Sequence, residues 1–379
     1  MNQKIIAYLE GEVNRYSLPS LQVLVTRNSK TVLRYQYQCD EKSMYIGYSS
    51  TKPVIGAAIA KLITEGRTAL DIPAYEYLPE MRNLRVFKRD QNGMIIGEEK
   101  LDEGKPILIG HLVSMTGGIA DNIWTDYIQS AIQSGKKSSR EIVEAILRQP
   151  LSFEPGTDFK YGLSLDVLAV IIEQITGKKL SEYLVETFFE PLNIQDTTFH
   201  PTAGQKSRIL QQYMWYDDGG YCYAVPNVND LVFTEEYESG GAGLYFTGDD
   251  YMKFAAMLAN GGTGQDGERI LSAEAIENMR TPLLNQHNKE RFRTLLGFPG
   301  YSYGMGVRVM DEPGKQGYLT PAGEFGWQGK GGTYSSICPE LHTAIFMGIQ
   351  VCDYHPVNTV MHNELREKLY GAIINDELS

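Results

Sequence analysis

Apolar residues recur at helical spacing in several parts of the chain. The clearest case is 50–65, where the apolar positions are Val54, Ile55, Ala58, Ile59, Leu62 and Ile63. This period of about 3.6 residues predicts a helix. Pro53 falls in the first turn, where its missing N–H costs nothing, and Gly66 supplies a stop. Similar patterns predict helices at 2–16, 108–115, 138–149, 163–176, 180–189, 248–260, 272–281 and 357–374.

Alternating segments are typical of strands and occur near both ends of the chain. Segments 21–25 and 31–35 flank a polar turn and predict a hairpin, as do 85–87 and 94–96 around Asn92-Gly93. Three further strand-like runs lie at 305–310, 333–338 and 343–349. Strands at both ends with helices between them predict an α/β (α+β) fold, with one sheet built from both termini. We therefore expect a discontinuous α/β domain of 1–70 and 225–379, with a mostly helical insert at 71–224.

The amino-acid composition argues against several classes of protein. The chain has 379 residues, 42% of them hydrophobic, and a formal net charge of −12. The apolar content is too high for a disordered protein, and no run of roughly 18 apolar residues predicts a membrane span. The acidic balance argues against nucleic acid as a partner, because a phosphate backbone requires a basic face.

Cysteine and histidine usage gives no sign of a metal site. The four cysteines (Cys39, Cys222, Cys338 and Cys352) and the six histidines show no ligand spacing. The first residues resemble an amphipathic helix and not a signal peptide. We therefore expect reduced cysteines, no metal and a cytoplasmic location.

The first candidate nucleophile is Ser49, in a Ser-x-x-Lys sequence that ends at Lys52. Residues three apart share one face of a helix, so the Lys52 amine can reach the Ser49 hydroxyl. A partly desolvated lysine can accept a proton, and a helix N-terminus favours developing negative charge. The motif is weak by itself, since Ser134 and Lys137 repeat it in a polar stretch. The predicted strand–loop–helix context distinguishes the first copy.

A second candidate is Ser302, in the Gly-x-Ser-x-Gly sequence of 300–304, with Asp311 and His342 following in triad order. A nucleophile elbow requires a helix after the serine. The residues that follow Ser302 alternate as in a strand, so we favour Ser49.

Eight ordered motifs resemble those of the serine β-lactamase-related superfamily, in particular class C β-lactamases and family VIII carboxylesterases. They span about residues 20 to 350. The matching segments are Tyr48–Val54, Ile63–Arg67, Leu70–Pro73, Tyr77–Glu80, His111–Gly118, Phe153–Thr157 leading to Tyr161, Ser239–Leu244 and Phe325–Gly329. The resemblance implies a β-lactamase/transpeptidase-like fold and no metal or organic cofactor.

The resemblance also implies residue roles. Ser49 would be the acylated nucleophile, and Lys52 and Tyr161 would carry its proton to the leaving group. The backbone N–H groups of Ser49 and Lys330 would form the oxyanion hole. Trp327, Gln328 and Gly329 would line the substrate site.

Two departures from the β-lactamase pattern concern the substrate. Leu163 replaces the asparagine of the second motif, and Trp327-Gln328-Gly329 replaces Lys-Thr-Gly. An indole suits an acyl or aryl group, while the loss of an amide and a cation disfavours β-lactams. Lys330, one residue further on, leaves an anionic substrate open.

We therefore expect a serine hydrolase that acts on small carboxylic esters through an acyl-enzyme at Ser49. A β-lactamase, a D-amino-acid peptidase or amidase, and an acyltransferase remain alternatives, because each would use the same acyl-enzyme at Ser49. A noncatalytic binding protein is the alternative from another class, although such a protein has no need of Ser49, Lys52 and Tyr161 together. Pocket roles are open for Trp124, for Tyr127 and for the aromatic cluster of 213–223. The sequence does not determine the oligomeric state.

Overall fold

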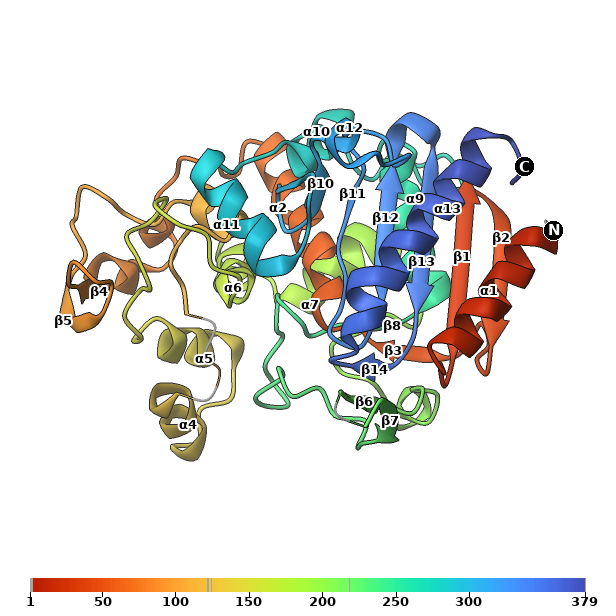
Figure 1. The fold of residues 1–379 in the computed structure, drawn as a ribbon. Helices are drawn as coiled ribbons and strands as arrows, with labels where there is room; N and C mark the ends of the chain where they lie inside the picture. The colour runs from red at the N-terminus through yellow and green to blue at the C-terminus, as the bar shows by residue number, and fades with distance from the viewer. Residues whose placement is uncertain (1–2, 121–122, 124, 218, 379) are drawn as a thin grey trace.

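The computed structural model describes residues 3–120, 123, 125–217 and 219–378. Its centre is an antiparallel sheet with the strand order β2-β1-β13-β12-β11-β10-β9 (Figure 1). The strands are β1 (Leu21–Arg27), β2 (Lys30–Tyr37), β9 (Tyr301–Tyr303), β10 (Arg308–Met310), β11 (Phe325–Gly326), β12 (Tyr334–Cys338) and β13 (Thr343–Gly348). The two ends of the chain therefore meet in one sheet.

The β1–β13 pair joins the ends of the chain and separates two apolar cores. Val23 pairs with Met347, and Leu24 pairs with Phe346. Because side chains alternate along a strand, the first pair packs in one core and the second pair in the other.

Helices cover both faces of the sheet. On one face lie α1 (Gln3–Arg15) and α13 (His362–Ile374), which bury Leu9 and Leu365 against it (Figure 1). On the other face α9 (Gly248–Ala259) packs against β1 and β13. Further in, α2 (Lys52–Thr64) has every residue from Lys52 to Ala60 buried. A helix enclosed in this way holds its first turn rigidly.

Most of the remaining elements extend to one side of the sheet or lie beneath it, while α10 and α12 lie above its upper edge in this view (Figure 1). The helices are α3 (Ile109–Val113), α4 (Asp126–Gln133), α5 (Ser139–Ile146), α6 (Ser164–Thr176), α7 (Leu180–Leu184), α8 (Ala203–Lys206), α10 (Ala273–Arg280), α11 (Gln286–Leu296) and α12 (Pro313–Gln316). Three small sheets pair β3 (Met44–Ile46) with β8 (Tyr245–Thr247), β4 (Arg85–Arg89) with β5 (Ile95–Lys100), and β6 (Tyr213–Tyr216) with both β7 (Tyr221–Ala224) and β14 (Val351–Cys352).

The observed architecture confirms the predicted fold class, with a central antiparallel sheet that draws strands from both ends. Several predicted boundaries are wrong. The strand expected at 305–310 is reduced to Arg308–Met310. The helix expected at 180–189 is α-helical only as far as Leu184 and continues as a π-helical turn over Val185–Phe189. The proposed division into 1–70 with 225–379 and 71–224 stays a prediction. No helix in the described ranges is long and apolar enough to cross a membrane.

A buried ion pair lies in the sheet, between β10 and the start of β11. The Arg308 guanidinium donates to Glu324 Oε1 at 3.0 Å, and both side chains are 0% exposed. Tyr301 and Ser336 also donate to the Glu324 carboxylate, at 3.0 and 2.5 Å. Removal of one partner of such a pair leaves an uncompensated buried charge.

We expect Glu324→Gln to lower the free energy of unfolding by about 3 kcal/mol, because Arg308 loses its countercharge. Urea unfolding followed by circular dichroism measures this change. Glu103→Gln is the control, since Glu103 pairs with Lys100 at the surface and such pairs contribute about 0–1 kcal/mol. Equal effects of the two substitutions would contradict the prediction.

Candidate active site

Ser49 stands in a tight turn between β3 and α2. The turn is a 3₁₀ segment, Tyr48–Thr51, that runs directly into the helix. Tyr48 adopts φ +45°, a left-handed conformation that non-glycine residues rarely take. Its buried hydroxyl donates to Gln212 Oε1 at 3.0 Å, and this contact holds the turn. Ser49 is partly exposed here, at the N-terminal end of a buried helix.

Lys52 lies one turn after Ser49 and is 3% exposed. Its Nζ donates to Ser49 Oγ at 2.9 Å and to the Gly241 carbonyl at 2.7 Å. The same nitrogen lies 4.7 Å from the centroid of the Tyr161 ring. No carboxylate of the described residues lies within ion-pair distance of this amine. The amine is therefore held between the serine oxygen, a carbonyl and an aromatic face.

The Gly241 carbonyl is positioned by a buried carboxylate on α6. Asp166 Oδ1 accepts from Tyr237 and from Ser239, each at 2.6 Å. A Cβ at Gly241 would lie 2.6 Å from Asp166 Oδ2, so only glycine fits between this carboxylate and Lys52. Asp166 thus holds the loop in place through these hydrogen bonds. No pattern in the sequence indicated that a backbone carbonyl of this loop would bind Lys52.

Tyr161 meets Trp327 above Lys52. The indole Nε1 donates to the Tyr161 hydroxyl oxygen at 2.8 Å, and the rings lie 5.5 Å apart. Trp327 is 2% exposed and packs against Tyr303 and Phe298. An indole N–H can only donate, so the Tyr161 oxygen accepts here. The hydrogen of that hydroxyl remains available to another acceptor.

The loop after Trp327 packs directly on the Ser49 turn. A Cβ at Gly329 would lie 2.4 Å from the Gly47 carbonyl oxygen, so this approach requires glycine. Ser50 Oγ and Thr333 Oγ1 are 2.8 Å apart and join the same two segments. The backbone of 329–330 is therefore held beside Ser49.

The Lys330 side chain is not available as an unpaired cation. Its Nζ donates to Asp230 Oδ2 at 2.7 Å and lies 5.9 Å from the centroid of the Tyr48 ring. Burial lowers the pKa of Lys330, but the hydrogen bond and charge of Asp230 outweigh it and leave the pKa raised. Asp230 was not singled out in the sequence, because no motif marks it.

Nearly the whole sequence matches the model of one known protein family. The family model described as Beta-lactamase matches residues 3–351. The chain belongs to the beta-lactamase family. Within this family it is 30% identical to Protein Rv1367c of Mycobacterium tuberculosis, over 80% of this chain and 76% of that protein. It is 28% identical to Esterase EstB of Burkholderia gladioli, over 76% and 72% of the two chains.

A solved structure supports the fold of this beta-lactamase-family chain. It belongs to "EstCE1, a hydrolase with promiscuous acyltransferase activity" and superposes with a TM-score of 0.77 at 18% identity. The match covers 97% of this chain and 98% of that one. The β-lactamase/transpeptidase-like fold expected from the sequence is therefore confirmed, and the chain is a serine hydrolase of this family.

The other candidates suggested by the sequence take no part in this arrangement. Ser302 is fully buried in β9, and Asp311 pairs with Lys289. Ser302 therefore does not stand in an exposed nucleophile elbow. Tyr127 is exposed on α4, and Trp124 lies outside the described residues.

The predicted aromatic cluster forms the β6–β7 hairpin, where Trp215 stacks on Tyr354 at 4.1 Å. Whether this cluster lines a substrate pocket is not tested by these contacts. The described part of the chain contains no group of three or more metal-ligating side chains.

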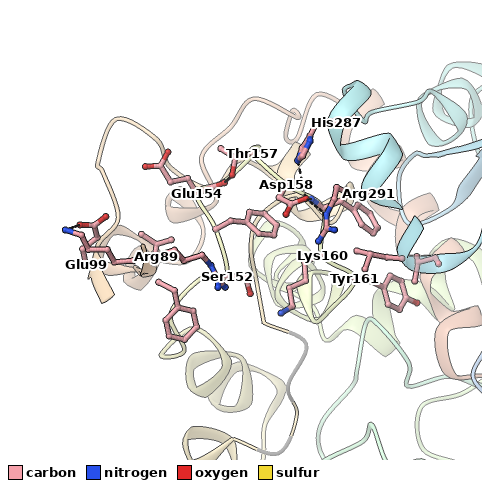
Figure 2. A pocket seen from close by; sticks show the side chains of 17 residues that line it. Arg89, Glu99, Ser152, Glu154, Thr157, Asp158, Lys160, Tyr161, His287 and Arg291 are labelled. Atoms are coloured by element: carbon pink, nitrogen blue, oxygen red, sulfur yellow. Dashed lines mark hydrogen bonds and ion pairs between the residues drawn. The ribbon is translucent and has the colours of Figure 1, made fainter. Parts of the chain in front are cut away.

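A groove of about 1080 Å³ opens beside Tyr161 (Figure 2). Tyr161 lines it, whereas Ser49 and Lys52 do not. Its walls come from the β4–β5 hairpin, the segment 152–161 and α11. The lining residues are Val86, Phe87, Lys88, Arg89, Glu99, Ser152, Phe153, Glu154, Thr157, Asp158, Phe159, Lys160, Tyr161, His287, Arg291, Leu295 and Leu296.

Proposed function

We propose that this serine hydrolase cleaves carboxylic esters through an acyl-enzyme on Ser49. Lys52 takes the proton of the Ser49 hydroxyl as the oxygen attacks the ester carbonyl. Tyr161 delivers a proton to the departing alkoxide, and water then releases the acid by the same route in reverse. The backbone N–H groups of Ser49 and Lys330 stabilise the tetrahedral oxyanion.

The observation that carries this proposal is the contact between Lys52 and Ser49. The amine is buried, lies 2.9 Å from the serine oxygen, and faces the Tyr161 ring on its other side. A nucleophile within hydrogen-bond reach of a buried base, with a second proton carrier beside it, is the arrangement that acyl transfer requires. A noncatalytic binding protein has no use for this arrangement.

The surroundings of the site favour an ester over a β-lactam. Leu163 offers no amide to a substrate, and Trp327 puts an uncharged, largely buried indole where the lactamase pattern has a lysine. Lys330 does not restore that charge, because Asp230 neutralises it. We propose Trp327, Gln328 and Gly329 as the substrate-binding edge. The name of the relative EstB is in line with an ester substrate.

An acyltransferase is the second candidate, because the same acyl-enzyme can pass its acyl group to an alcohol instead of water. EstCE1, which shares the fold, is described as having such an activity. The large groove beside Tyr161 gives an acceptor alcohol a place to bind. A β-lactamase and a D-amino-acid peptidase or amidase remain alternatives.

Covalent labelling tests the proposed nucleophile. We expect a fluorophosphonate probe to add once to the chain, with peptide mapping placing it on Ser49. Initial rates with 4-nitrophenyl acetate and a chromogenic cephalosporin then rank the substrate classes, and we expect kcat/KM to be at least about 100-fold higher for the ester. Labelling at Ser302, or faster turnover of the cephalosporin, would overturn the proposal.

A further inference from the structure

The groove beside Tyr161 has a definite place in the proposed reaction. Tyr161 is the proposed proton donor to the leaving alcohol, so the alcohol must lie against its hydroxyl when the ester bond breaks. Tyr161 lines the groove and the nucleophile does not. The groove is therefore placed to receive the leaving alcohol, while the acyl group would remain on the side of Ser49.

The volume of the groove and its apolar lining residues indicate an alcohol much larger than methanol or ethanol. Its volume is about 1080 Å³, just above the ~300–1,000 Å³ typical of small-molecule sites. Apolar side chains from three segments contribute to its lining, among them Phe87, Phe153 and Leu296. An extended alcohol with an apolar body would fill this space.

The charges of the groove differ from those of the whole chain. Acidic residues outnumber Lys and Arg by 47 to 35 in the sequence. The residues that line the groove include four Lys and Arg side chains and three carboxylates (Figure 2). Such a reversal in an otherwise acidic protein raises the local concentration of anions.

Each carboxylate of the groove already has a basic partner. Asp158 accepts from Arg291 at 3.2 Å, and Glu99 lies 3.6 Å from Lys88. Glu154 pairs at 2.8 Å with Lys105, which is not a lining residue. Each of the three carboxylates is therefore paired with a basic side chain other than Arg89.

Arg89 is a cation of the groove with no carboxylate partner among the described residues. Its guanidinium donates to the Gly93 carbonyl at 2.8 Å and is otherwise exposed toward the groove (Figure 2). Its five N–H donors have a planar geometry that suits a carboxylate. Arg89 and Tyr161 line the same groove, and Lys330 does not.

We propose that Arg89 binds a carboxylate at the far end of the leaving alcohol, so that the enzyme prefers esters of long ω-hydroxy acids. This inference rests on the proposed esterase function and adds the substrate class. In this arrangement the ester oxygen of the substrate lies at Tyr161. Its alkyl chain runs along the apolar lining residues, and its carboxylate binds the Arg89 guanidinium.

Matched substrates test the proposal directly. Acetate esters of ω-hydroxyalkanoic acids, in a series of chain lengths, are compared with the corresponding primary amides, which have nearly the same shape without the charge. We expect kcat/KM to favour the carboxylate by about tenfold at the best chain length. Arg89→Gln should remove this preference and leave the rate with the amide unchanged. Lys100→Gln is the matched control, because Lys100 is an exposed cation on the same hairpin that does not line the groove.

Equal kcat/KM for acid and amide in the wild type at every chain length would overturn the proposal. An equal loss on both substrates in Arg89→Gln would also overturn it. Failure of the wild type on 4-nitrophenyl acetate would contradict the esterase function instead. In that case calorimetric binding of the free ω-hydroxyalkanoates still decides on Arg89: weaker binding in Arg89→Gln supports the site, and equal binding rejects it.

Discussion

Replacement of Ser49 by alanine is expected to lower kcat/KM for 4-nitrophenyl acetate by about 10⁵-fold, the order found when a hydrolase loses its nucleophile. The physical reason is that, among the described residues, Ser49 has the hydroxyl that is hydrogen-bonded to the Lys52 amine. Ser50, the neighbour in sequence, is buried and bonded to Thr333. The measurement is a steady-state rate, with circular dichroism to show that the fold is kept.

Two serine variants provide controls for this result. Ser302→Ala should leave kcat/KM within about twofold of the wild type, since this side chain is fully buried in β9. Ser50→Ala removes the contact to Thr333 and should cost far less activity than Ser49→Ala. Retention of more than a hundredth of the activity in Ser49→Ala would show that the acyl-enzyme forms elsewhere.

Replacement of Lys52 by arginine is expected to lower kcat/KM by about 10⁴-fold, although the positive charge is kept. A guanidinium cannot lose its proton in a protein, so it cannot serve as a base. If Lys52 acted only as a fixed charge toward Ser49 and the Gly241 carbonyl, arginine would retain much of the activity. The substitution therefore separates proton transfer from electrostatic stabilisation.

Lys52→Met provides the comparison, because it keeps an unbranched side chain, one atom shorter than that of lysine, and removes both charge and basicity. We expect Lys52→Met and Lys52→Arg to be similarly inactive. The pre-steady-state rate at which the fluorophosphonate probe phosphonylates Ser49, with loss of fluoride, measures the step in which Lys52 takes part. An arginine variant that labels at the rate of the wild type would contradict the role of a base.

The periodic parts of the fold were predictable from sequence, while short elements were not. Helix α2 and the β1–β2 hairpin have patterns long enough to define a period, and they lie where the sequence predicted them. Strands β3, β8 and β11 have two or three residues each, too few to show alternation. The hairpin β6–β7 was not predicted either, because aromatic residues occupy both of its faces.

The candidate site shows the same limit. The spacing of Ser49 and Lys52, and the place of Tyr161 after Phe153–Thr157, could be found in the sequence. The acceptor of the second Lys52 hydrogen bond is a backbone carbonyl, that of Gly241, which has no side-chain signature. Asp230 could not be found either, since it meets Lys330 only through the packing of two distant loops.

The pairing of β1 with β13 has a consequence for the newly made chain. Val23 reaches its partner Met347 only after more than three hundred further residues have been synthesised. The central sheet therefore closes late, and long-range pairing of this kind slows folding. Ser49, Tyr161 and Lys330 lie more than one hundred residues apart from one another in the sequence, so the proposed site assembles only after all three segments have been synthesised. A ribosome-bound fragment that ends before β13 has the Ser-x-x-Lys sequence without the assembled site, so we expect no acylation of Ser49 before β13 has been synthesised.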